Sequence, residues 1–382
     1  MSFYLASKEI WRNKGRFLLF SLVIALITVL VLFIAALAQG LGLANKEYIE
    51  KLNAELIVFQ EKVELSTTTS RVGLDKLNDL RRLKGVADVG AIGFSSATLV
   101  LPNGQKSLDI SLIGAQSDKP GMPPVLSGNP IRSNRGYQAV IDGSIASRND
   151  ISIGDEITVK TIVGSEDKFY RLKVVGITDG QQYFYQPSVF IPFETWDKIR
   201  PQATEGQSQY NLVANVIAVK LTNPQDIQIM AKYIVNQVGD VEVVDRKTAY
   251  EATPGYSAQQ STLNTQQGFT LLIGILVIGG FFQIQTLQKV PQIGVLKAIG
   301  TQNNIIAFTV IMQIILVTII GVALGSIGTF LLSLGLPNGI PILLTGKTAI
   351  ITIITLLMIG PIGGLVSVQL ALRVEPLTAL GM

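Results

Sequence analysis

Ser144 and Ser188 are the first side chains to consider for chemistry, because a serine becomes a nucleophile when a neighbouring base activates it. The chain contains no histidine, which excludes a serine–histidine hydrolase. It contains no cysteine either. Disulfides, zinc sites and acid–base catalysis by histidine are therefore excluded for this chain alone.

The carboxylates that stand next to expected turns are isolated from one another, as is typical of solvated or helix-capping side chains. They are Asp142, Asp155, Asp179 and Asp197. Asp240 and Glu242 lie two apart on an expected strand, which indicates a solvated sheet edge rather than a metal pair. The sequence thus predicts no catalytic, cofactor-binding or metal-binding residue.

The segment Gly346-Lys347-Thr348 resembles the end of a phosphate-binding loop. That loop requires a glycine five positions before Gly346, where this chain has Pro341. We therefore expect no ATP binding by this motif.

The charged residues are unevenly distributed along the 382 residues, of which 15% are charged, against about 25% in a typical soluble domain. Residues 1–44 and 252–382 hold five charged residues each, and residues 45–251 hold the other 48. This pattern predicts a charged domain between two membrane regions. The net charge of +4 comes from the apolar regions, so we expect no nucleic-acid partner.

Four apolar stretches are long enough to cross a bilayer. Phe17 to Ala38 has no charged residue, and its 22 residues span roughly 33 Å as a helix. A secretory signal peptide is the alternative for this stretch, but its apolar region is usually only about 7–15 residues long. We predict transmembrane helices at 17–44, 268–287, 304–336 and 348–372, in a layout of one plus three.

Basic residues flank these helices on one side of the membrane if both termini are cytoplasmic: Lys8, Arg12, Lys14, Arg16, Lys289, Lys297 and Arg373. We therefore predict a multi-pass protein of the cytoplasmic (inner) membrane with its large domain outside. Residues 1–16 are expected to form a cytoplasmic interfacial helix, 337–347 an outer loop and 373–382 a cytoplasmic tail.

Residues 45–251 alternate strand and helix patterns with turn signals between them. The leucine spacing of residues 74–83 predicts an amphipathic helix, and the turn residues at 102–105 and 164–167 predict two hairpins. Helical segments are segregated from hairpins, so we predict a large α+β extracytoplasmic domain between the first and second transmembrane helices. The polar residues 252–267 are expected to form a linker back to the membrane.

The short segment 288–303 has aliphatic residues where a connector is normally polar. Its pattern predicts a compact, partly amphipathic helix with Ile293, Leu296 and Ile299 in one stripe and Gly300 as a C-cap. A plain connector is the alternative, but exposed aliphatic residues in the cytoplasm favour a partner groove. On the third helix, Gly321, Gly325 and Gly328 form a small-residue face, which suits either packing within the chain or a dimer interface.

The stretch from Gln292 to Gly300 (Gln292, Ile293, Gly294, Val295, Leu296, Lys297, Ala298, Ile299, Gly300) is similar to the coupling loop of the MacB-like, or FtsX-like, family of ABC transporter permeases. Val140 to Val159 and the tail Arg373 to Leu380 resemble other segments of that family. The chain departs from the family pattern at Pro291-Gln292, where arginine and glutamate are commoner. Gly40 to Ser70 is more similar to the branch of that family containing the haem exporter HrtB and DevC than to the macrolide exporter.

This resemblance implies a non-catalytic permease subunit, a homodimer that works with a separate ABC ATPase subunit. ATP and Mg would bind to that partner and no cofactor to this chain, while residues 292–300 would transmit closure of the ATPase. The implied function is export of an amphipathic or hydrophobic substrate, such as a drug, lipid, peptide or haem, with a periplasmic adaptor or membrane fusion protein as a further partner. Two alternatives stay open: a regulatory FtsX-type protein that activates an external cell-wall hydrolase, and a membrane-anchored receptor.

Overall fold

The computed structural model describes residues 14–101, 107–203, 212–335 and 342–373. The chain divides into two units, Met1–Gly40 with Gln260–Met382 and Leu41–Gln259. The segments 1–13, 102–106, 204–211, 336–341 and 374–382 lie outside the described residues. Most of the predicted interfacial helix, one predicted hairpin turn, part of the outer loop and most of the tail therefore lie outside this description.

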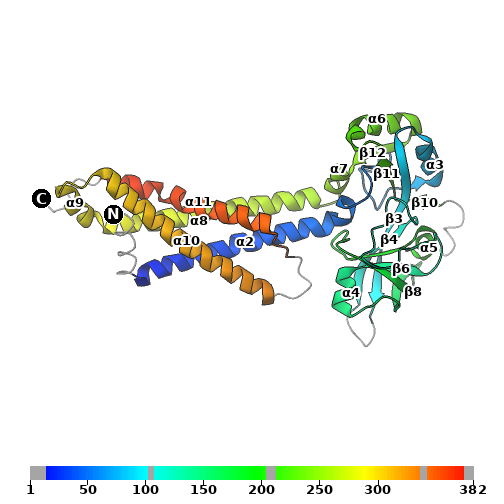
Figure 1. Ribbon diagram of the computed structural model, residues 1–382, viewed down its shortest axis with the longest axis horizontal. Helices are drawn as coiled ribbons and strands as arrows, with labels where there is room; N and C mark the ends of the chain where they lie inside the picture. Colours follow the sequence, from blue (N-terminus) through cyan, green and yellow to red (C-terminus); the bar gives the residue numbers. More distant parts are fainter. Residues whose placement is uncertain (1–13, 102–106, 204–211, 336–341, 374–382) are drawn as a thin grey trace. The chain divides into compact units, whose positions relative to one another are not determined.

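The first unit is built from long apolar helices (Figure 1). Their bounds are α2 Lys14–Glu50, α8 Tyr256–Gln288, α10 Asn303–Gly335 and α11 Gly346–Arg373. A short helix, α9 (Val290–Ala298), lies between α8 and α10. Within the described residues, four helices are long and apolar enough to cross a membrane. The prediction of four transmembrane helices with a large α+β domain between the first two is confirmed.

The helix bundle is held together by an apolar core and by close approaches at glycine. The apolar core includes Val31 and Leu32 of α2, Phe282 of α8, and Ile314 and Val317 of α10, and all five are at most 2% exposed. A Cβ atom added at Gly279 would lie 2.7 Å from the carbonyl oxygen of Gly363, so α8 and α11 approach too closely for any side chain there.

Contacts at the two ends of the bundle show which helix ends lie together. At one end, Lys289 after α8 lies 5.8 Å from the ring of Phe17 in α2. At the other, Leu343 donates its backbone N–H to the carbonyl of Ala36 at 3.1 Å, and Gln39 bonds to Thr345. The start of α2, the end of α8 and helix α9 therefore share one end, as Figure 1 also shows.

The second unit contains a ten-stranded mixed sheet. Its strands are β1 Leu56–Gln60, β3 Val86–Val100, β4 Leu108–Ala115, β5 Ser127–Gly128, β6 Gln138–Asp142, β7 Glu156–Val163, β8 Glu166–Thr178, β9 Ser188–Pro192, β11 Val216–Leu221 and β12 Val241–Asp245. A separate pair joins β2 Val72–Gly73 to β10 Val213–Ala214.

Six of the ten strands are paired in a closed circuit, in the order β3-β4-β9-β6-β8-β7 and back to β3. The pairs β4·β9 and β6·β8 are parallel, and the other four are antiparallel. The long strand β3 takes part in this circuit and also pairs with β11, from which β1 and β12 continue as an open sheet. A closed circuit leaves few free strand edges.

Short helices cover parts of this sheet (Figure 1). They are α3 Leu74–Arg82, α4 Gly143–Asn149, α5 Phe193–Ile199, the 3-10 helix Pro224–Asp226, α6 Ile227–Val238 and α7 Arg246–Glu251. The predicted amphipathic helix at residues 74–83 corresponds to α3, whose Leu77 and Leu80 are buried. Helices α3 and α6 lie together beside β11 and β12 in Figure 1.

The polar linker expected at residues 252–267 differs most from the structure. Helix α8 begins at Tyr256, so most of this segment is helical. The sequence Ser257–Gln267 is rich in Gln, Ser and Thr and lacks an apolar stripe. Such a composition removes the periodic signal for a helix without preventing helix formation, since Gln and Ala are good helix formers.

Candidate functional site

A single residue, Lys289, separates helix α9 from the end of α8. Lys289 follows α8 and donates its N–H to the carbonyl of Thr286 at 3.0 Å, and its own carbonyl accepts from the N–H of Ile293 at 2.9 Å. Pro291 occupies the first turn of α9. The first backbone N–H groups of a helix have no intrahelical partner, so proline costs nothing at this position. The departure from the family pattern at Pro291 is therefore compatible with the helix.

Helix α9 ends in a Schellman motif. Gly300 has φ of 94° and donates its N–H to the carbonyl of Lys297 at 2.9 Å, while Thr301 donates to the carbonyl of Leu296 at 3.0 Å. These two bonds satisfy carbonyls that would otherwise lack a partner at the helix end. A positive φ is open to glycine at little cost, which explains why glycine follows the helix.

One face of α9 is fixed to the bundle. Ile293 is 6% exposed and packs with Ile306 of α10 and Ala371 of α11. Two lysines add polar anchors: the Nζ of Lys289 donates to Oε1 of Gln313 in α10 at 3.0 Å, and the Nζ of Lys297 donates to the carbonyl of Leu372 at 2.8 Å. A lysine at the last carbonyls of a helix also interacts favourably with the helix dipole.

The other face of α9 leaves aliphatic side chains uncovered. Val295 is 43% exposed, Leu296 46% and Ile299 78%. We call these three residues the α9 patch. Gln292 and Ala298 are also exposed.

The sequence placed Ile293 in one stripe with Leu296 and Ile299, whereas the structure separates them. Ile293 faces inward, and Val295 joins the exposed residues instead. The helix is apolar nearly all round, so periodicity alone does not decide which aliphatic residues face the bundle. Residues 292–300 therefore comprise an inner anchor and an outer patch. Gly294 belongs to the inner part, since it is buried.

The three glycines of α10 that the sequence singled out lie against α2 of the same chain. A Cβ atom added at Gly321 would lie 2.6 Å from Cβ of Ile24, and one at Gly325 would lie 2.6 Å from the carbonyl oxygen of Ala25. At Gly328 the nearest atom, in Val29, would be 3.3 Å away. The glycines thus permit close packing of α10 on α2.

Two family models together cover most of the chain. The model of the MacB-like periplasmic core domain matches residues 17–237, and that of the FtsX-like permease C-terminal region matches residues 268–376. The chain belongs to the MacB-like, FtsX-like family of ABC transporter permeases. The second match includes α9, α10 and α11.

Individual proteins are similar to this permease over most of its length. A Staphylococcus haemolyticus protein named as the hemin transport system permease HrtB is 28% identical over 378 residues, which is 99% of each chain. An uncharacterized ABC transporter permease of Mycobacterium tuberculosis is 21% identical over 82% of this chain and 81% of that protein. A crystal structure of the periplasmic region of MacB from Actinobacillus actinomycetemcomitans aligns with 53% of this chain and 94% of its own, with TM-score 0.37 and 16% identity.

The last turns of α2 are anchored in the extracytoplasmic domain of the permease. Tyr48 is 1% exposed, donates its hydroxyl to the carbonyl of Gly121 at 2.7 Å, and donates its backbone N–H to the carbonyl of Gln182 at 3.0 Å. Arg246 donates to the carbonyls of Glu50 and Leu52, both at 2.9 Å, and so caps the helix end. Sequence reasoning did not find these anchors, because their partners are far apart along the chain.

Two candidate carboxylates of the permease, Asp142 and Asp197, have structural partners. Asp142 is 1% exposed and accepts from the backbone N–H of Ser144 at 2.8 Å and of Gln181 at 2.7 Å. Burial raises the pKa of Asp197, and its bond with Arg200 at 3.0 Å opposes that rise. Within the described residues, no group of three or more acidic side chains is arranged to hold a metal ion.

Proposed function

We propose that this permease couples a separate ABC ATPase to movement of its extracytoplasmic domain and thereby exports an amphipathic or hydrophobic substrate. The observation that carries the proposal is the α9 patch: three aliphatic side chains exposed on a short helix that is itself fixed to α10 and α11. Burying such side chains in a partner groove contributes at most about 1.5–3 kcal/mol each. The patch therefore suits docking of an ATPase subunit.

The anchors of α9 support a route for force into the bundle. A displacement of α9 acts on α10 through Lys289 and Ile293 and on α11 through Lys297. Close contacts at Gly321 and Gly325 connect α10 to α2. Packed interfaces of this kind move as rigid pieces because the interior is dense.

Helices α2 and α8 suit the last step of this route. Both are unbroken from the first unit into the second: α2 from Lys14 to Glu50 and α8 from Tyr256 to Gln288. An α-helix resists compression and extension, since each turn is closed by backbone hydrogen bonds. We propose that these two helices carry the motion to the extracytoplasmic domain.

The distribution of basic residues supports an orientation with both termini in the cytoplasm. Lys14, Lys289, Lys297 and Arg373 belong to helix ends at the α9 end of the bundle. Positive residues are retained on the cytoplasmic side of membranes. In this orientation the α9 patch is available to a cytoplasmic ATPase, and the domain between α2 and α8 is outside.

The proposed assembly is a homodimer of the permease on two ATPase subunits, which would bind ATP and Mg, with a periplasmic adaptor or membrane fusion protein as a further partner. No cofactor is proposed for this chain. The name of the staphylococcal relative places hemin among the substrates to test. The apolar stretch Phe17–Ala38 has no charged residue, which suits extrusion from the outer side better than a polar pore.

The proposal is tested by purifying the tagged chain from its native membrane in detergent and identifying the proteins that co-elute. We expect an ABC ATPase with the parent chain and its loss from the variant Val295→Ser, Leu296→Ser, Ile299→Ser. The matched control is Asn304→Ser, an exposed polar residue at the start of α10 and outside residues 292–300, which should retain the ATPase. Ile293 is not substituted because it is an internal anchor.

Two results would contradict the proposal. Absence of an ATPase from both preparations would argue against coupling and favour a receptor. An ATPase retained by the triple variant would remove the α9 patch from the docking surface. Co-elution of a cell-wall hydrolase, together with unchanged hemin retention in cells lacking the permease, would favour the regulatory alternative over export.

A further inference from the structure

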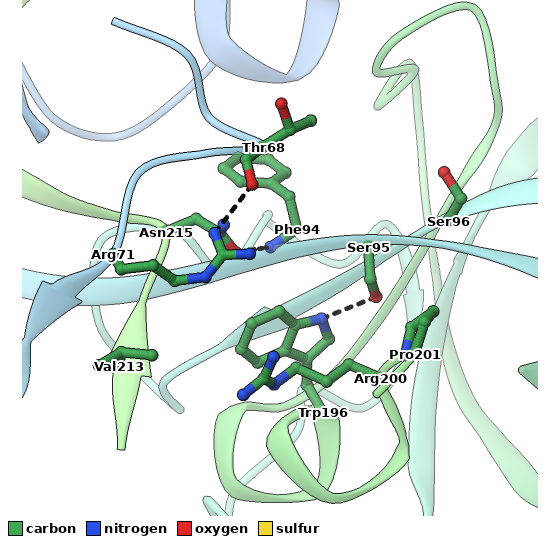
Figure 2. A pocket seen from close by; sticks show the side chains of 10 residues that line it. All are labelled: Thr68, Arg71, Phe94, Ser95, Ser96, Trp196, Arg200, Pro201, Val213 and Asn215. Carbon is green, nitrogen blue, oxygen red and sulfur yellow. Dashed lines mark hydrogen bonds between the residues drawn. The ribbon is translucent and has the colours of Figure 1, made fainter. Parts of the chain in front are cut away.

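The extracytoplasmic domain contains a pocket that coupling to an ATPase leaves unused. It has a volume of about 240 Å³, and ten residues from four parts of the chain line it (Figure 2). They are Thr68, Arg71, Phe94, Ser95, Ser96, Trp196, Arg200, Pro201, Val213 and Asn215. Pockets for drug-sized ligands measure roughly 300–1,000 Å³, so this pocket suits a smaller molecule or a single chemical group.

The wall beside Trp196 is apolar and fixed in place. Trp196 is 3% exposed, and its indole N–H donates to the hydroxyl of Ser95 at 2.9 Å. That hydroxyl donates to the carbonyl of Leu112 at 3.3 Å. The neighbouring backbone N–H of Phe94 donates to Oδ1 of Asn215 at 2.7 Å, while the Phe94 ring packs against Tyr183 on the other face of β3. The aromatic part of the pocket is therefore preorganised.

Arg71 enters the pocket with unused donors. Its Nη1 donates to the carbonyls of Thr68 at 2.8 Å and Ser70 at 2.7 Å, which fixes the position of the guanidinium group. Within the described part of the chain, Nη2 and Nε of Arg71 make no hydrogen bond. A guanidinium group has five N–H donors, so Arg71 can still bind an anion.

Arg200 reaches the same pocket from the end of α5. Its Nε donates to Oδ1 of Asp197 at 3.0 Å, and its guanidinium carbon lies 5.3 Å from the centre of the Trp196 ring. Figure 2 shows the guanidinium group of Arg200 against the Trp196 ring and that of Arg71 beside Asn215, on the side of Thr68. Stacking on Trp196 and the bond to Asp197 orient Arg200 while its two terminal nitrogens stay available within the described residues.

The charges around the pocket do not cancel. Among the described residues, Asp197 is the one carboxylate paired with these arginines, and its partner is Arg200. Two positive charges therefore face one negative charge. Burial and the nearby charge of Arg200 lower the pKa of Arg71, which indicates that the two guanidinium groups repel each other. A bound monoanion would relieve this repulsion.

We propose that this pocket binds the carboxylate of a small molecule that also carries a flat apolar group. The carboxylate would lie between Arg71 and Arg200, since guanidinium groups bind carboxylates through paired N–H donors. The apolar group would lie against Trp196. A net charge of +1 matches a monoanion better than a phosphate monoester, which carries about −1.5 to −2 at neutral pH. The site does not depend on coupling to an ATPase.

The test uses the full-length permease in detergent with Trp11→Phe, because Trp11 and Trp196 are its two tryptophans. Trp196 then reports binding through its fluorescence. Benzoate is titrated at constant ionic strength without ATP or an ATPase, in parallel with neutral benzamide and with phenyl phosphate. We expect saturable quenching by benzoate, with benzamide and phenyl phosphate binding at least tenfold more weakly.

Variants separate binding from folding. Arg71→Gln should weaken benzoate binding roughly 10- to 100-fold, as expected for loss of a charge-assisted bond, while Lys198→Gln on the same domain surface should not. Arg71 also bonds to the carbonyls of its own loop, so a second pair of variants leaves Arg71 in place. Ser96→Asp adds a negative charge to the pocket and should abolish benzoate binding, whereas Ser96→Asn should preserve it. Absence of saturable quenching, equal binding of benzamide, tighter binding of phenyl phosphate, or benzoate binding undiminished by Ser96→Asp would overturn the proposal.

Discussion

The Nζ of Lys297 donates to the backbone carbonyl of Leu372 at 2.8 Å, so the short helix α9 is tied to the last turn of α11. Together with Lys289 and Ile293, this bond makes α9 part of the bundle rather than a loose connector. A partner that binds the α9 patch therefore acts on two transmembrane helices at once.

Replacing Lys297 by methionine should loosen α9 without unfolding the bundle. The bond to the carbonyl of Leu372 is charge-assisted but only half-buried, so its loss should cost about 1 kcal/mol. Hydrogen exchange measured by mass spectrometry should be about fivefold faster across Val290–Ala298. Lys347→Met, at an exposed position near the start of α11, is the control. Equal exchange in both variants would show that Lys297 is no anchor.

Replacing Gly325 by leucine should force α10 away from α2. A Cβ atom there would lie 2.6 Å from the carbonyl oxygen of Ala25, and a longer side chain has no room. Overpacking of this kind costs about 1–3 kcal/mol or more. The midpoint of thermal unfolding in detergent should fall by roughly 2–4 °C per kcal/mol. Gly280→Leu is the matched control, because a Cβ at Gly280 meets no atom within 4 Å. If both variants melt alike, the glycine contact does not hold the two helices.

Removing the carboxylate of Asp142 should loosen the loop on which α2 ends. Asp142 accepts from Ser144 and from Gln181, and the next residue, Gln182, bonds to Tyr48 of α2. Asp142→Ala leaves two amides without this acceptor and should cost about 2–4 kcal/mol in chemical unfolding. Asp179→Ala removes the same charge from an exposed position close by and should have little effect. Similar losses in the two variants would mean that charge, not hydrogen bonding, is responsible.

Tyr183 should make the extracytoplasmic domain sensitive to alkali. Burial raises its pKa to about 12, and the hydrogen bond with Thr67 opposes this shift. Because the folded pKa lies above the unfolded value of about 10, the stabilising contribution of Tyr183 is full below pH ~10 and is lost as the pH rises toward 12. Tyr183→Phe should be less stable than the parent at pH 8, by about 1 kcal/mol, yet lose less stability between pH 10 and 12. Tyr137→Phe, 54% exposed in the parent, should follow the parent curve. Parallel curves for parent and Tyr183→Phe would contradict this assignment.

Local signals in the sequence predicted the elements that depend on local chemistry. The charge-free runs gave the four membrane helices, and the leucine spacing of residues 74–83 gave α3. Turn residues Gly164-Ser165 marked the hairpin of β7 and β8. In each case, the residues that form the sequence pattern are the same residues that form the turn or helix.

Long-range contacts were beyond reach of the same reasoning. The parallel pairing of β4 with β9 joins residues more than 70 positions apart, and alternation of side chains does not specify a partner strand. The inward face of α9 was missed because its aliphatic residues surround the helix, so packing against Ile306 and Ala371 decides which one is buried. The pocket at Arg71 and Arg200 combines segments that look like ordinary loops in the sequence.

The continuity of α2 and α8 has a consequence for the helical phase of residues along each helix. Inserting one residue between Gly40 and Leu41 would rotate everything beyond it by about 100° and advance it by about 1.5 Å, while α8 would keep its original phase. Seven inserted residues would restore the phase to within about 20°. The same arithmetic applies to α8, so in either helix a length change of seven residues preserves the helical phase of the residues on both sides of it.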